Sequence, residues 1–123
     1  MDRRVKGTLS ELLVLTRLVR EGYSIAIPFG NQKGWDCLVE TPSGWDKYQV
    51  KTAYRRSDRP SISVDCIRSG DPKSKDRGRD RGYSEGELDF LIAVDLDSCM
   101  MWKLPSEKVV GRRSRVLTTE FIW

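Results

Sequence analysis

The fold is decided by residues 35–54, which read WDCLVETPSGWDKYQVKTAY. Residues 35–41 and 46–54 are rich in the β-branched and aromatic side chains that favour strands. Between them lie Pro42, Ser43 and Gly44, which together form a turn signal. Because so short a connection joins them, the two strands are predicted to form an antiparallel hairpin.

The flanking sequence predicts one helix and several further strands. Apolar side chains recur at helical spacing over residues 7–21, and Gly22 ends the pattern. The tail at 116–123 is apolar and fits either a last core strand or an assembly surface. This order predicts an α+β fold with a mixed central sheet. The remaining predicted elements are strands at 23–28, 61–67, 88–96 and 100–104, and a short helix at 107–110 with Ser106 as its cap.

Length and composition limit the classes of protein. The chain has 123 residues, which predicts a single domain over residues 1–123 with an ordinary hydrophobic core. It contains no histidine, so Ser-His-Asp and Cys-His catalysis, zinc sites built on histidine and a histidine general base are excluded. Cys37, Cys66 and Cys99 are widely spaced, which indicates neither a disulfide framework nor a metal knuckle and favours a reducing compartment.

The charge balance is modestly basic. Lys and Arg number 22 against 18 for Asp and Glu, a net charge of +4. This bias suits either a polyanionic partner or a basic soluble domain with no nucleic-acid role. No run approaches the roughly 18 apolar residues of a membrane span, and the first residues hold no signal-peptide core. We therefore expect a cytoplasmic protein of a prokaryotic or phage-type context with no membrane partner.

Glu11 is a carboxylate on the apolar side of the predicted helix. At about 100° per residue it lies within about 20° of Leu18 and about 40° of Leu15. A carboxylate on a buried face needs a partner, for example a cation. Thr8 and Glu11 also fit a capping box that closes the first turn of the helix, so both interpretations stay open.

The predicted hairpin brings further oxygen-bearing groups to Glu11. Asp36 begins one strand, and the other carries Gln49, Val50 and Lys51, with Gln49 and Lys51 on one face. Taken singly, these residues also fit a turn and a solvated strand face. Together, Glu11, Asp36, the Gln49 amide and the Val50 backbone carbonyl can supply the oxygen ligands that Mg²⁺ or Mn²⁺ prefers. Lys51 would orient or deprotonate the attacking water, or offset charge on a phosphate.

Several short motifs in this order resemble the PD-(D/E)XK nucleases, and most closely the subgroup of group I intron-encoded homing endonucleases. The resemblance implies a restriction-endonuclease-like αβββαβ core and a metal-dependent DNA endonuclease. It implies that Asp36 is the principal metal ligand, Glu11 a second ligand and Lys51 the catalytic lysine. The similar stretches, which span roughly residues 5–107, are Gly7-x3-Glu11-Leu12, Glu21-Gly22-Tyr23, Pro28-Phe29-Gly30, Asp36, Gln49-Val50-Lys51-Thr52-Ala53, Glu87-Leu88-Asp89-Phe90 and Trp102-x2-Pro105.

Two positions depart from the family pattern. The carboxylate that usually stands two residues before the lysine is Gln49 here, which implies one less negative charge and a more loosely held metal. The usual proline before the aspartate is Trp35. Glu40 lies on the same strand face as Asp36 but about 13 Å along the strand, which disfavours it as a displaced carboxylate.

Basic residues that could contact phosphates follow the catalytic strand and fill the next polar stretch. Residues 66–87 form a long basic loop insertion. This insertion fits either a loop that reaches over the duplex, with arginines that read guanines, or a solvated segment without that role. The predicted DNA-binding residues are Arg55, Arg56, Arg59, Arg68, Lys73, Lys75, Arg77, Arg79 and Arg81.

The sequence and the resemblance thus predict a site-specific, divalent-metal-dependent endonuclease of the homing type that acts on double-stranded DNA. One nuclease site cuts one strand, so a double-strand break at a defined position is expected to need a homodimer or homotetramer. One alternative is a Holliday-junction resolvase or repair nuclease on the same core. The others are a DNA-binding module whose catalytic site has decayed and a structural protein that binds no nucleic acid.

Overall fold

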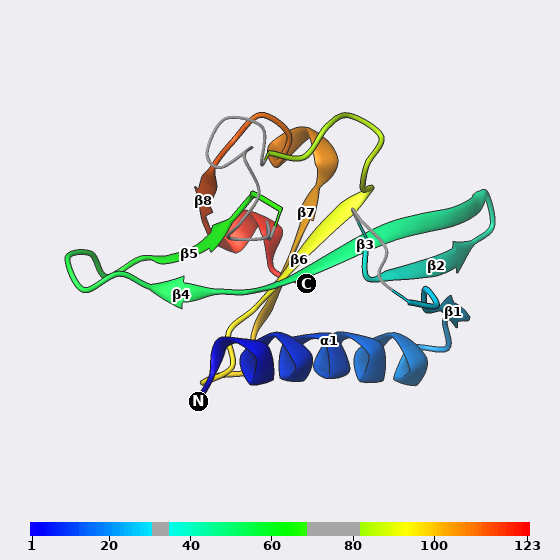
Figure 1. Cartoon of the computed structure of the whole chain (residues 1–123), viewed down its shortest axis with the longest axis horizontal. Helices are drawn as coiled ribbons and strands as arrows, with labels where there is room; N and C mark the ends of the chain where they lie inside the picture. The colour runs from blue at the N-terminus through cyan, green and yellow to red at the C-terminus, as the bar shows by residue number, and fades with distance from the viewer. Residues whose placement is uncertain (31–34, 69–81) are drawn as a thin grey trace.

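The computed structural model describes residues 1–30, 35–68 and 82–123. In this part of the chain one long helix packs on one face of a five-stranded sheet, and a three-stranded sheet packs on the other face (Figure 1). The predicted α+β class and mixed sheet are confirmed. None of the helices in these ranges has the length and apolar character needed to cross a membrane.

Helix α1 (Arg3–Arg20) begins earlier than the predicted residue 7. Asp2 caps it, since its side chain accepts a hydrogen bond from the Arg4 N–H at 2.6 Å. Thr8 lies inside the helix and donates its hydroxyl to the Arg4 carbonyl at 3.0 Å. The capping box of Thr8 and Glu11 is therefore wrong, because the first turn lies upstream of both residues.

The face of α1 that packs on the sheet is narrower than the part of the helix surface that its apolar side chains cover. Ser10, Val14 and Leu18 are buried, whereas Leu12 and Val19 face solvent. Glu11 lies beside the buried stripe and is half-buried. Its side chain therefore projects from the side of the helix that packs on the sheet, as its position on the helical wheel predicts.

The central sheet has the strand order β1-β2-β3-β6-β7. Strands β2 (Cys37–Thr41) and β3 (Gly44–Thr52) form the predicted antiparallel hairpin, with β1 (Ile25–Ala26) at its edge. On its other side β3 runs parallel to β6 (Phe90–Val94), which forms an antiparallel pair with β7 (Met101–Pro105). The sheet is mixed because the chain crosses over between β3 and β6.

The second sheet consists of β4 (Tyr54–Arg55), β5 (Ile62–Asp65) and β8 (Ser114–Val116). Among the described residues no second α-helix lies between β3 and β6. The short helix predicted at 107–110 is a 3-10 turn, η1 (Ser106–Lys108), and Ser106 does not cap it. The apolar tail forms β8 and a second turn, η2 (Thr119–Phe121), and buries Leu117 and Phe121 in the core.

The two faces of β3 belong to different parts of the core. Tyr48 and Val50 pack in the cluster that contains Val14 and Leu18 of α1. Ala53 belongs to the cluster on the opposite face, under β5 and β8. Because side chains alternate along a strand, Gln49 and Lys51 share the face of Ala53.

Candidate active site

The site lies where β3 extends beyond its partner β2. The register ends with Cys37 opposite Tyr48, so the described residues place no strand against that edge of β3 from Gln49 onward. Asp36 fills the beginning of this gap. Its N–H donates to the Tyr48 carbonyl at 2.7 Å, and its Oδ2 accepts from the Val50 N–H at 2.8 Å. Because the N–H and C=O of one strand residue point to the same edge, the Val50 carbonyl also faces the gap.

Helix α1 brings Glu11 to this gap. The hydroxyls of Ser10 and Thr52 are hydrogen-bonded at 2.7 Å, and the Thr52 hydroxyl also donates to the Lys6 carbonyl at 3.4 Å. These contacts anchor the helix beside the open edge of β3, where Glu11 hydrogen-bonds Asp36. Ser10 and Thr52 could not be identified from the sequence, because two small polar side chains give no signal until the helix is packed on the sheet.

The carboxyl group of Glu11 holds its proton more tightly than an exposed glutamate does. Burial, followed by the hydrogen bond with Asp36 and the negative charge of Asp36, raises its pKa from 4.5 to about 7. In the metal-free protein Glu11 therefore keeps its proton at mildly acidic pH. A cation at this position would replace the proton.

Lys51 and Gln49 project from the sheet face opposite to α1, and both are half-buried. Burial lowers the pKa of Lys51, while the negative charges of Asp36 and Asp65 oppose this effect. Lys51 thus lies on the same strand as the gap and within the electrostatic influence of Asp36. Glu40 is exposed on β2 at the far end of the hairpin, so it does not join this group.

The candidate ligands offer oxygen atoms to a metal. The carboxylates of Glu11 and Asp36 and the Val50 carbonyl lie at the gap, and the Gln49 amide belongs to the neighbouring residue of β3. In the part of the chain that the structure describes, no three His, Cys, Asp or Glu side chains are grouped for a metal. Two carboxylates with neutral oxygens fit Mg²⁺, which keeps several waters and commonly binds proteins through one or two carboxylates.

Replacing Glu11 with Gln is expected to make the metal-free protein less sensitive to pH. Because folding raises the pKa of Glu11, its contribution to stability is full below pH 4.5 and is lost as pH rises through about 7. The variant should therefore gain stability relative to wild type on going from pH 5 to pH 8. Urea unfolding in chelator at both pH values measures this difference. Glu107→Gln, at an exposed glutamate of η1, should keep the wild-type dependence, and an unchanged dependence in Glu11→Gln would contradict the assignment.

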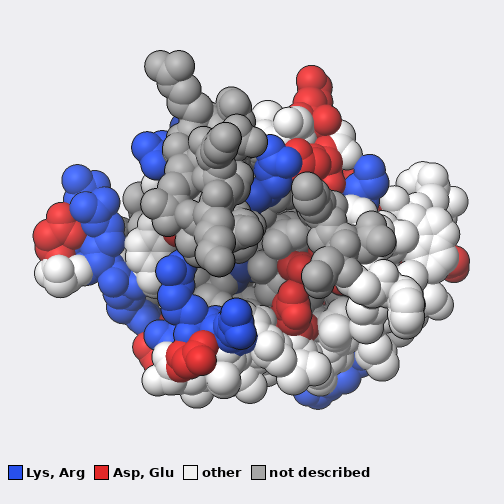
Figure 2. All heavy atoms as spheres, in the orientation of Figure 1, with Lys and Arg blue, Asp and Glu red and all other residues white. Residues whose placement is uncertain are grey.

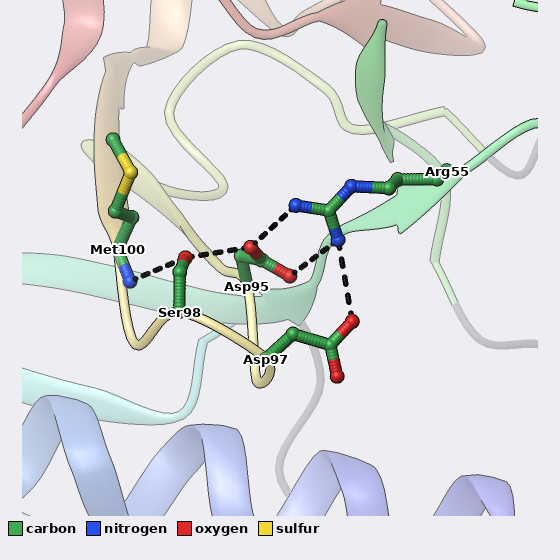
Figure 3. Close-up of polar contacts among 5 residues, drawn as sticks. All are labelled: Arg55, Asp95, Asp97, Ser98 and Met100. Atoms are coloured by element: carbon green, nitrogen blue, oxygen red, sulfur yellow. Dashed lines mark hydrogen bonds and ion pairs between the residues drawn. The ribbon is translucent and has the colours of Figure 1, made fainter. Parts of the chain in front are cut away.

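Arg55 is held by carboxylates of the protein itself (Figure 3). Its Nη1 and Nη2 donate to the two oxygens of Asp95 at 3.1 and 3.0 Å, and Nη1 also donates to Asp97 at 3.3 Å. Ser98 donates its hydroxyl to Asp95 at 2.6 Å, and the Met100 N–H donates to Ser98 at 3.2 Å. This network ties β4 to the turn between β6 and β7. A phosphate contact by Arg55 would have to compete with it.

The other predicted DNA-binding residues fall into three groups. Arg56 pairs with Asp58 at 3.1 Å, and Arg59 is exposed nearby. Figure 2 shows basic side chains gathered over the end of the molecule where β4 and β5 lie. Arg68 donates to the Gly82 carbonyl at 3.3 Å and lies 3.6 Å from Glu87. The predictions that lie outside the described residues are Lys73, Lys75, Arg77, Arg79 and Arg81.

The helix, the mixed sheet and the oxygen-lined gap together define a class of nuclease fold. Residues 1–120 match the model of the PD-(D/E)XK endonuclease family. The chain therefore belongs to this family, as the resemblance of its motifs implied.

Two known proteins are similar over nearly the whole chain. Protein 5.3 of Escherichia phage T7 is 27% identical over 93% of this chain and 95% of that protein. The structure of a bacterial homing endonuclease, I-Ssp6803I, matches with a TM-score of 0.80 and 17% identity over 96% of this chain and 79% of that chain. The structural match confirms the restriction-endonuclease-like fold.

Proposed function

We propose that this protein is a site-specific, divalent-metal-dependent DNA endonuclease of the homing type. The main support is the contact of two carboxyl groups beside a strand carbonyl at the open edge of β3, with a half-buried lysine on the same strand. Placing two acids in contact in a partly buried site is unfavourable unless a proton or a cation lies between them. The match to the PD-(D/E)XK endonuclease family supports a catalytic role for this arrangement.

Asp36 is the principal ligand in this proposal. The Val50 N–H orients one of its oxygens, so the carboxylate is already aimed along the open edge. Glu11, the Val50 carbonyl and Gln49 complete the protein's share of the ligands. A divalent cation bound there would neutralise charge on the scissile phosphate and make a water more acidic. Lys51, whose pKa burial lowers, would orient that water, accept its proton or offset charge on the phosphate.

Double-stranded DNA is the proposed substrate, and a homodimer or homotetramer the proposed assembly. The basic residues over β4 and β5, among them Arg56 and Arg59, support contact with phosphates. The structural neighbour is described as a homing endonuclease, which supports the homing type. The tail contributes Leu117 and Phe121 to the protein's own core, so of its apolar side chains Val116 and Ile122 remain exposed for an assembly.

Cleavage of a supercoiled plasmid library tests the proposal. With Mg²⁺ the wild type is expected to yield discrete linear products, and a chelator should prevent them. Lys51→Ala should cut slower by on the order of 10²-fold or more, because it removes the proton-transfer and charge-offsetting group. Lys47→Ala is the matched control, since Lys47 lies on the same strand and bonds to the Gly86 carbonyl at 3.0 Å. Equal cutting by the wild type and Lys51→Ala would contradict the assigned role.

A second candidate is a DNA-binding module whose catalytic site has decayed, and the neutral Gln49 favours it. Under this alternative the wild type binds duplex DNA with marked salt dependence but does not cut it at any Mg²⁺ concentration. Gln49→Glu separates the two. In an active enzyme it should lower the Mg²⁺ concentration needed for half-maximal cleavage, because it adds a negative charge beside the metal.

A further inference from the structure

Tyr83 carries a buried hydroxyl group that has no hydrogen-bond partner among the described residues. The whole side chain is only 3% exposed. The Oε2 atom of Glu87 is also buried and has no hydrogen-bond partner among the described residues, although Oε1 of that carboxylate accepts from the Ser84 N–H. Buried polar atoms of this kind are destabilising, and in native proteins they generally face an ordered water or an ion.

The ring of Tyr83 lies on the face of the central sheet opposite to α1, from which Gln49 and Lys51 project. It belongs to the core cluster that contains Leu91 and Ala93. Leu91 is the register partner of Gln49, and Ala93 is the register partner of Lys51. The unpartnered hydroxyl is therefore buried on the same side of β3 as the two functional side chains of that strand.

The charges around Tyr83 also connect it with the proposed metal site. Burial raises the pKa of Tyr83, and the negative charges of Asp36 and then Glu87 raise it further. The phenol therefore stays neutral at all ordinary pH values. Its hydroxyl group therefore keeps a proton to donate and an oxygen that can accept. It lies within the electrostatic influence of Asp36, the carboxylate that would hold the cation.

We propose that Tyr83 is a positioning residue whose hydroxyl hydrogen-bonds a water of the divalent cation that Asp36 holds. This inference rests on the proposed function. Mg²⁺ keeps several of its waters in proteins, and partners beyond the direct ligands orient those waters. The hydroxyl would thus gain its partner only when the cation binds. Oε2 of Glu87 could accept a hydrogen bond from another water of the same cation.

Tyr83→Phe tests this because it removes one oxygen atom and keeps the ring. Without metal the variant should unfold at the same temperature as wild type or higher, since it loses a buried group without a partner. With Mg²⁺, about 10-fold more of the ion should be needed for half of the metal-dependent rise in Tm. Tyr48→Phe is the matched control: Tyr48 is also 3% exposed but packs on the α1 face, so it should keep the wild-type Mg²⁺ dependence.

The outcomes separate this inference from the proposed function. If wild type and Tyr83→Phe respond equally to Mg²⁺, the inference is overturned and the metal site stands. A Tyr83→Phe variant that is less stable without metal but equally responsive to Mg²⁺ would point to a structural water and overturn it as well. If neither wild type nor Asp36→Asn responds to Mg²⁺, the metal site itself is contradicted, and the inference fails with it.

Discussion

Asp36→Asn is expected to cut DNA slower by on the order of 10²–10³-fold while keeping its fold. Asparagine retains an oxygen that can accept from the Val50 N–H, so the contact at 2.8 Å survives. It loses the negative charge on which the proposed cation site depends. The same loss removes the repulsion that helps to raise the pKa of Glu11, so the metal-free variant should be no less stable than wild type at pH 8.

Single-turnover cleavage and thermal unfolding, measured side by side, check this prediction. Asp46→Asn is the control, since Asp46 lies on the same hairpin opposite Val39 and away from the gap. It should cut like wild type. If Asp36→Asn cut within a few-fold of wild type, Asp36 would not be the principal ligand. If it unfolded at a much lower temperature, its loss of cleavage would say nothing about metal.

Asp95→Ala is expected to reduce the free energy of unfolding by about 2 kcal/mol. Asp95 is 4% exposed and accepts hydrogen bonds from Arg55 and Ser98 (Figure 3). Although burial raises the pKa of Asp95, the hydrogen bonds from Ser98 and Arg55 and the charge of Arg55 outweigh it and hold the pKa below its usual value. Its stabilisation is therefore present at neutral pH and is lost as pH falls through that lowered pKa.

Asp97→Ala removes the other carboxylate that Arg55 contacts and serves as the control. The Asp97 side chain is 89% exposed, so water screens its attraction to the arginine and the change should cost less than about 0.5 kcal/mol. Urea unfolding at pH 7 measures both variants. Equal losses in the two would show that burial does not decide the strength of this network.

The elements that could be predicted from the sequence are those set by neighbouring residues. The hairpin of β2 and β3 follows from strand-forming side chains around Pro42 and Ser43. The start of α1 was misplaced, because its cap is Asp2 and the first turn is polar. The exposed positions of Leu12 and Val19 could not be predicted, since periodicity shows which side chains share a face but not how wide a face the sheet covers.

Candidate residues for the site could be proposed from the sequence, but the way the fold brings them together could not. Asp36, Gln49 and Lys51 belong to one hairpin, so strand geometry alone relates them. The anchor that brings Glu11 to them is the bond between Ser10 and Thr52, which joins residues 42 positions apart. Arg55 shows the opposite case. Its charge and its place directly after β3 predict a phosphate contact, but a carboxylate 40 positions away is hydrogen-bonded to it.

The sequence by itself determined the chemistry that is available to this protein. With no histidine and with Glu11, Asp36, Gln49 and Lys51 in that order, oxygen ligands and a lysine are its candidate groups, and short-range geometry sets the helix and strands that carry them. Only the tertiary structure decided that β2 stops short of Gln49, that α1 packs beside the gap and that the Tyr83 hydroxyl is buried without a partner among the described residues. Those features depend on contacts between distant segments, which form only when the apolar faces of the helix and both sheets are buried together.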